Sequence, residues 1–83
     1  MNVIIHPHAR ERMTERGATV DEVEAAIEAG EQFAARLGRY GFRRNFPFEG
    51  TWRGRTYGIK QVEVYAVKEK GTWVVITVIV KYF

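Results

Sequence analysis

The chain has 83 residues, 13 of them basic and 10 acidic, with a formal net charge of +3 at pH 7 and no cysteine. This length holds one domain with one small core, and the lack of cysteine excludes disulfides, a thiolate nucleophile and a cysteine-based zinc site. No apolar stretch approaches the roughly 20 residues of a membrane span, and the first residues carry no charged leader. We therefore expect one soluble, cytoplasmic domain over residues 1–83, with no membrane partner.

The first third of the chain predicts a short strand followed by two helices. Residues 3–5 are apolar and β-branched, which favours a strand. Pro7 suits the first turn of a helix and Gly17 is a favoured residue just after its end, so a helix is expected between them. Thr19 and Glu22 have the spacing of a capping box and begin a second helix. Its expected buried face consists of Val20, Val23, Ala26 and Ile27.

The middle of the chain changes from helical to strand-like periodicity. Aromatic and other side chains alternate along residues 40–48, which predicts a strand. Pro47 cannot donate to a central ladder, so this strand is expected at an edge or in irregular form. Residues 52–55 predict a turn.

Two further strands are predicted at residues 57–68 and 72–83, joined as a hairpin in which Gly71 supplies a positive φ. The second is apolar on both faces along residues 73–80, so we expect it to be a central strand covered on both sides. The predicted order is β-α-α-β-β-β, an α+β domain with two helices packed on one mainly antiparallel sheet.

The spacing of His8, Arg12 and Arg16 is the most informative functional pattern. Side chains four residues apart lie on nearly the same face of a helix. One imidazole and two guanidiniums in a single stripe suit a phosphate ligand. The alternative for His8 is a structural residue at the helix start. The alternative for the arginines is pairing with Glu15 or with glutamates of the second helix.

Charge is segregated along the chain. Residues 17–35 carry five acidic side chains and no basic one, whereas residues 36–55 carry six arginines and one glutamate. Arginines interleaved with aromatic residues are typical of surfaces that bind a phosphate backbone. An acidic protein partner, mutual neutralisation within the fold, and an ordinary solvated face are the alternatives.

Several other residues are candidates for contact with nucleic acid. Arg43 and Arg44 lie between phenylalanines, which suggests single-strand binding; the alternative places the rings in the core and the arginines in water. Lys60 can stabilise charge in a groove or protect a sheet edge. Lys81 and Tyr82 follow the apolar run, where the tyrosine can contact a phosphate or base, or close the core.

The chain resembles an uncharacterised bacterial domain family placed in the RelE/ParE-like toxin superfamily. The resemblance rests on His8-x3-Arg12-Met13-x-Glu15-Arg16-Gly17 followed by a capped acidic helix, on Tyr57-x2-Lys60-Gln61-Val62-Glu63-Val64, and on Val74-Val75-Ile76-Thr77-Val78-x2-Lys81-Tyr82. It implies a RelE-like fold, a toxin of a type II toxin–antitoxin pair that cuts mRNA, and a cognate antitoxin as partner.

Metal-independent cleavage of RNA needs a base, an acid and positive charge at the scissile phosphate. His8 is the candidate base or acid, Arg12 the phosphate clamp and Lys60 the charge stabiliser. Arg16, Arg43, Arg44, Lys81 and Tyr82 are the candidate nucleic-acid-binding residues. We expect no metal and no cofactor, and RNA, including ribosome-bound mRNA, as the substrate. The alternatives are a non-catalytic nucleic-acid- or protein-binding module and a structural domain that oligomerises through a sheet edge.

Overall fold

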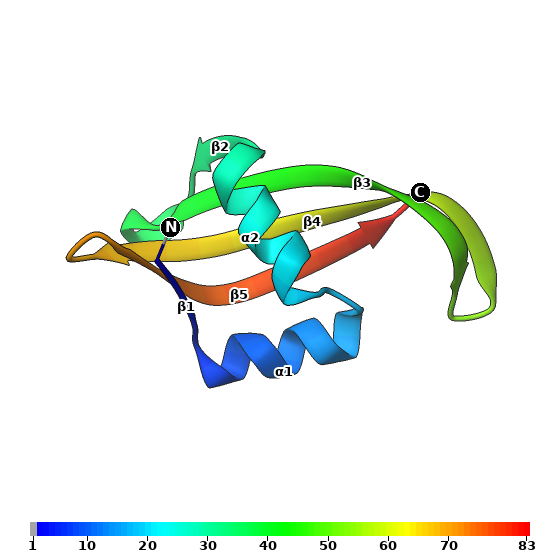
Figure 1. Ribbon diagram of the computed structural model, residues 1–83, viewed down its shortest axis with the longest axis horizontal. Coiled ribbons are helices and arrows are strands. Elements are labelled where there is room, and N and C mark those ends of the chain that lie inside the picture. The colour runs from blue at the N-terminus through cyan, green and yellow to red at the C-terminus, as the bar shows by residue number, and fades with distance from the viewer. Residues whose placement is uncertain (1) are drawn as a thin grey trace.

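Two helices cover one face of a five-stranded sheet in the computed structural model, which describes residues 2–83 (Figure 1). In chain order the elements are β1 (Val3–Ile5), α1 (Pro7–Arg16), α2 (Val20–Ala29), β2 (Glu31–Ala34), the 3-10 helix η1 (Arg36–Gly38), β3 (Tyr40–Trp52), β4 (Arg55–Glu69) and β5 (Thr72–Tyr82). The strand order is β1-β5-β4-β3-β2, and only the β1–β5 pair is parallel. The predicted α+β class, with two helices on a mainly antiparallel sheet, is confirmed.

Local capping interactions place both helices where the sequence predicts them. Pro7 occupies the first turn of α1, and Gly17 ends the helix in the left-handed conformation with φ of 81°. At α2 the Thr19 hydroxyl accepts from the Glu22 backbone N–H, and the Glu22 carboxylate accepts from the Thr19 N–H, at 3.1 and 3.0 Å. These bonds satisfy backbone donors that a helix start leaves without a partner.

The core lies between the two helices and the sheet. In Figure 1, α2 crosses β3 and β4 while α1 lies along β5. The buried apolar residues are Ile5, Ala9, Met13, Val23, Ala26, Ile27, Phe42, Val62, Val64, Ala66, Val75 and Val78. Val20, which was expected on the buried face of α2, is exposed because it is the first residue of the helix.

The sheet differs from the prediction in two respects. First, the sheet contains a short strand that the sequence did not predict, β2, which pairs with residues 40–43 of β3. Only Phe33 of this strand is half-buried, so its sequence shows no clear alternation of apolar and polar residues. Second, residues 73–80 were expected to form a central strand covered on both sides; β5 does lie inside the sheet, between β1 and β4, but it is next to the edge strand and β4 is the middle strand. β1 pairs with β5 only along Trp73–Val75, so from residue 76 onward no described strand lies beyond β5.

Two-residue turns connect the three long strands. Arg53 and Gly54 have φ of 51° and 80°, and Lys70 and Gly71 have φ of 49° and 79°. Positive φ at both central residues is the geometry that matches the twist of a two-residue hairpin. Pro47 lies beyond the part of β3 that pairs with β2, on a free edge, as predicted.

None of the helices in residues 2–83 is long and apolar enough to cross a membrane.

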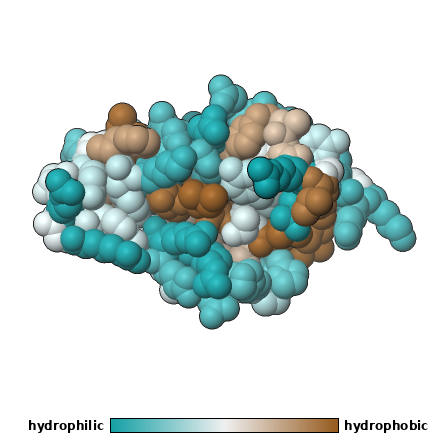
Figure 2. Space-filling view, turned by 180° about the vertical axis from the view of Figure 1, so that it is seen from behind, coloured by the Kyte–Doolittle hydropathy of each residue, from teal (hydrophilic) through white to brown (hydrophobic). Residues whose placement is uncertain are grey.

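The helices leave the other face of the sheet uncovered, and Figure 2 views the molecule from that side. Apolar surface lies in the middle of this view, between hydrophilic regions (Figure 2). The strand register places three rows of residues on this open face, each row with one residue from β3, β4 and β5. The rows are Gly41, Tyr65 and Thr77; Arg43, Glu63 and Ile79; and Asn45, Gln61 and Lys81. This open face and the adjoining edge of β5 hold the two pockets described next.

Candidate nucleic-acid interface

The stripe predicted on α1 forms, but its three side chains do not share a ligand site. His8 is exposed in the first turn. Arg12 Nη1 lies 2.8 Å from Glu15 Oε2, which is one of the alternatives weighed from the sequence. Arg16 Nη1 donates to the Val78 carbonyl oxygen at 2.7 Å. Of the three, only Arg16 joins α1 to another element, the strand β5.

Lys60 faces the helices and is only 6% exposed. Its Nζ lies 2.8 Å from Glu22 Oε1 and also donates to the Gly17 carbonyl oxygen, at the end of α1. His8 is nine residues earlier in the helix, roughly 13 Å along its axis. The structure thus does not bring His8 and Lys60 together. Lys60 lies neither in an open groove nor on a sheet edge, because β4 is the middle strand.

Arg43 and Arg44 project to opposite faces of the sheet, as successive strand residues do. Arg43 lies on the open face and pairs with Glu31 Oε1 at 2.9 Å and Glu63 Oε2 at 2.8 Å. Arg44 lies on the helix side and donates to the Ala25 carbonyl oxygen at 3.4 Å. These two arginines and the α1 stripe therefore do not form the single positive patch that the charge pattern suggested.

A carboxylate on the open face neutralises the cations around it. Glu63 is almost fully buried and accepts hydrogen bonds from Arg43 Nε at 2.8 Å and Tyr65 OH at 3.1 Å. Lys81 Nζ lies 3.6 Å away. Burial alone would raise the pKa of Glu63, but the hydrogen bonds from Arg43 and Tyr65 outweigh it and lower the pKa. Arg43 and Lys81 therefore already face a counter-ion.

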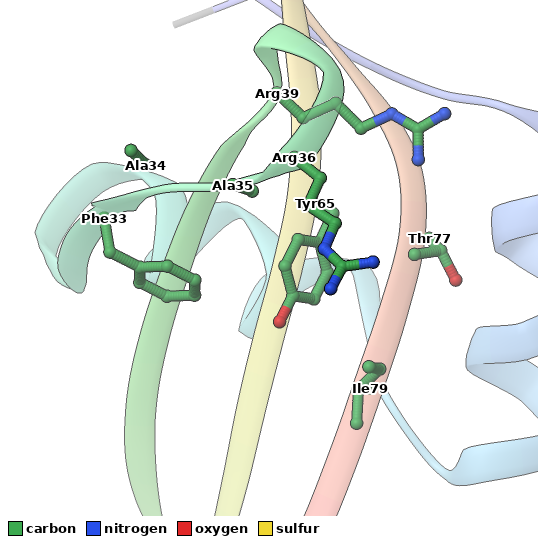
Figure 3. A pocket seen from close by; sticks show the side chains of 8 residues that line it. All are labelled: Phe33, Ala34, Ala35, Arg36, Arg39, Tyr65, Thr77 and Ile79. Carbon is green, nitrogen blue, oxygen red and sulfur yellow. The ribbon is translucent and has the colours of Figure 1, made fainter.

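A pocket of about 470 Å³ opens on the same face, beside η1 (Figure 3). We call it the η1 pocket; it is lined by Phe33, Ala34, Ala35, Arg36, Arg39, Tyr65, Thr77 and Ile79. The Phe33 and Tyr65 rings meet edge to face, with centroids 6.0 Å apart. Arg36 and Arg39 extend from one short segment toward β5 (Figure 3). Among residues 2–83 neither guanidinium forms an ion pair, so both charges are available to a ligand.

Two local features of the backbone build this pocket. The left-handed residues Leu37 and Gly38 reverse the chain in η1, and Arg39 N–H donates to the Arg36 carbonyl at 3.2 Å. This turn holds the two arginines three residues apart on one segment. Phe33 pairs with Gly41, and the glycine leaves room for the ring to lie on the sheet.

A second pocket of about 350 Å³ lies at the outer edge of β5, next to the β3–β4 hairpin. We call it the edge pocket; it is lined by Arg16, Trp52, Arg53, Ile79, Val80 and Tyr82. The Trp52 and Tyr82 rings stack with centroids 5.0 Å apart, and Tyr82 OH donates to the Arg16 carbonyl at 3.0 Å. Burial and the Glu22 carboxylate raise the pKa of Tyr82, so this hydroxyl stays protonated. Arg16 and Tyr82, both candidates from the sequence, meet here.

Sequence reasoning did not single out the η1 pocket. The sequence places Arg36 and Arg39 only in the basic segment and Tyr65 only in the strand predicted at residues 57–68, while Phe33 lies in no predicted element. The spacing Arg36-Leu37-Gly38-Arg39, in which a glycine permits a tight turn between two arginines, was the available signal. Its aromatic partners come from β2 and β4, so only the folded sheet reveals the pocket. Within residues 2–83, no three potential metal ligands cluster together.

The chain matches a protein family without an assigned activity. Residues 5–80 match the profile of a family described as a domain of unknown function (DUF4258). No curated protein and no solved structure matches the chain. Function therefore has to be inferred from the two pockets and their charges.

Proposed function

We propose that this chain, which belongs to the DUF4258 family, binds single-stranded RNA on the open face of its sheet. The observation that carries the proposal is the η1 pocket, where two guanidiniums without acidic partners stand beside two aromatic side chains. Positive charge for the phosphates and aromatic surface for the bases are the two requirements for binding a single strand.

The open face of the sheet suits bases that are not paired. RNA-binding domains with an exposed antiparallel sheet stack bases on its aromatic side chains. Phe33 and Tyr65 offer such surface, and alanine substitutions elsewhere put one base–aromatic contact at about 1–3 kcal/mol. A pocket of about 470 Å³ is large enough for a small ligand such as one nucleotide.

The pattern of ion pairs indicates which cations contact phosphate. Arg43 and Lys81 face Glu63, whereas Arg36 and Arg39 face only solvent and the pocket. If these two arginines neutralise two phosphates, they should contribute about −1.4 to the slope of log affinity against log salt for a single strand. A diffuse basic surface would instead lose little of its slope when only these two arginines are removed.

RNA cleavage by a RelE-like toxin has less support than binding. His8 is exposed at the start of α1, Arg12 pairs with Glu15, and Lys60 is buried with Glu22. These three predicted catalytic side chains do not converge on either pocket. We therefore propose a binding module without cleavage activity.

The test is fluorescence anisotropy with a labelled, unstructured RNA dodecamer over a range of salt concentrations. Replacing Arg36 and Arg39 together by alanine should lower the affinity at least tenfold and reduce the magnitude of the slope by about 1.4. The matched control is Arg10→Ala with Lys68→Ala, which removes two exposed charges outside both pockets. Absence of wild-type binding, or an equal loss in the control, would overturn the proposal.

A denaturing gel of the same RNA, incubated with the protein and a chelator, tests cleavage. We expect the RNA to stay intact. Shortened products that disappear in the His8→Ala variant would contradict the proposal of binding alone and support the metal-independent ribonuclease.

A further inference from the structure

We propose that the edge pocket is a second nucleotide subsite, and that one RNA strand runs across Ile79 from the η1 pocket into it. This inference rests on the proposed function, and it makes the ligand an oligonucleotide several residues long. Ile79 of β5 lines both pockets, so the two pockets adjoin at this side chain.

The two pockets share one composition although their residues come from different elements. The η1 pocket has two aromatic residues and two arginines, and the edge pocket has Trp52 and Tyr82 with Arg16 and Arg53. No acidic residue is among the described residues that line either one. Two basic, aromatic pockets that adjoin at the apolar Ile79 side chain suit one RNA strand. Its bases would stack on the aromatic rings, and the phosphates between the bases would contact the arginines.

Arg53 is the exposed residue of the edge pocket, and Trp52 beside it is half-buried. The Arg53 guanidinium carbon lies 5.5 Å from the centroid of the Trp52 ring, and Arg53 is exposed. Arg16 is half-buried and already donates to the Val78 carbonyl. Arg53 is therefore the more accessible cation for a phosphate, and the half-buried Trp52 ring, stacked on Tyr82, is the aromatic surface beside it.

The free edge of β5 adds a neutral donor to this pocket. Phe83 and Ile59 exchange backbone hydrogen bonds, so by alternation Lys81 and Ile79 also direct their backbone groups toward β4. The N–H of Val80 then points to the outer edge, where no described strand pairs with β5. Backbone N–H groups of this kind are common partners of phosphate oxygens.

The combined length of the two adjoining pockets sets the ligand length. Thr77 lines the η1 pocket and Tyr82 the edge pocket, and the five strand residues from one to the other span roughly 17 Å. A dinucleotide should occupy one pocket only, whereas a dodecamer can occupy both. The second contact is then intramolecular, so the dodecamer should bind at least tenfold more tightly than the dinucleotide.

The decisive variant is Arg53→Asn, because asparagine tolerates the left-handed φ of 51° at this turn. It should lower dodecamer affinity three- to tenfold and reduce the magnitude of the salt slope by about 0.7, with a smaller effect on the dinucleotide, which can still bind in the η1 pocket. The matched control is Lys70→Asn, which removes one charge from the other two-residue hairpin, at φ of 49° and outside both pockets. The control should change neither affinity.

The outcomes for the two proposals differ. If the dodecamer requires Arg36 and Arg39 but is indifferent to Arg53→Asn, or binds no more tightly than the dinucleotide, the second subsite is wrong and the proposed function stands. If the wild-type protein binds neither RNA, the proposed function fails and the subsite fails with it. Equal losses in Arg53→Asn and Lys70→Asn would show a general charge effect and overturn the subsite.

Discussion

The Phe33 ring lies so close to the backbone of Gly41 that a Cβ atom at position 41 would come within 2.3 Å of Phe33 Cε2. The two residues are paired across β2 and β3, and Tyr65 is the partner of Gly41 on β4. Gly41 therefore provides the space in which the aromatic wall of the η1 pocket is seated. This contact connects one glycine in the sequence to the shape of the proposed RNA site.

Gly41→Ala should displace Phe33, destabilise the fold by about 1–3 kcal/mol and weaken RNA binding. Urea unfolding and anisotropy with the RNA dodecamer measure the two effects. Gly58→Ala is the control, since a Cβ there meets nothing within 4 Å. A Gly41→Ala variant as stable and as tight in binding as Gly58→Ala would refute the role assigned to this contact.

Gly17→Ala should be at least about 1 kcal/mol more destabilising than Gly71→Ala. Both glycines are left-handed, with φ of 81° and 79°, so both substitutions carry the conformational cost. Only at Gly17 would the new Cβ also crowd Tyr82 OH at 2.7 Å and Trp52 Cζ3 at 2.9 Å, whereas Gly71 has open space. Equal losses of unfolding free energy in the two variants would show that the crowding is relieved at no cost.

Lys60→Ala should cost about 3–5 kcal/mol, because it leaves the Glu22 carboxylate without its buried partner. Glu22→Gln, which instead leaves the lysine charge unpaired, should also destabilise the protein strongly. Arg12→Ala removes a partly exposed pair and should cost less than about 1 kcal/mol. Chemical denaturation of the three variants provides the comparison. A Lys60→Ala variant with wild-type stability would show that the buried ion pair is not structural.

Acid should weaken the fold partly through Glu63. Its folded-state pKa lies below the ordinary value of 4.5, because hydrogen bonds from Arg43 and Tyr65 outweigh the effect of burial. A carboxylate with a lowered pKa stabilises the fold above its unfolded-state pKa, and that contribution is lost as pH falls through the folded-state value. The unfolding free energy of the wild type should therefore decrease as the pH is lowered below about 4.5.

Glu63→Gln should show a shallower decline in unfolding free energy over the same acidic range, from a lower starting value at neutral pH. The lower start follows because Arg43 loses one of its two carboxylate partners, the buried one. Urea midpoints measured between neutral pH and about pH 3 test this difference. Parallel curves for the wild type and the variant would contradict it.

The sequence by itself determined the features that depend on contacts between near neighbours. The Thr19–Glu22 capping box, the left-handed Gly17 and the Lys70–Gly71 hairpin each involve residues within a few positions of one another. Their geometry follows from backbone sterics and short-range hydrogen bonds, which the residue types reveal directly. The same local rules, with the periodicity of apolar residues, were enough to predict the α+β class.

Only the tertiary structure decided which polar side chains face solvent and which face each other. Lys60 is buried because the end of α1 and the side chain of Glu22 reach it from far along the chain. Arg43 has a counter-ion because strand pairing places it beside Glu63, while Arg36 and Arg39 have none among the described carboxylates. Strand order and register set these partners, and both depend on the packing of the whole sheet against the helices. Local sequence patterns do not contain that information, so the two pockets become visible only once the chain has folded.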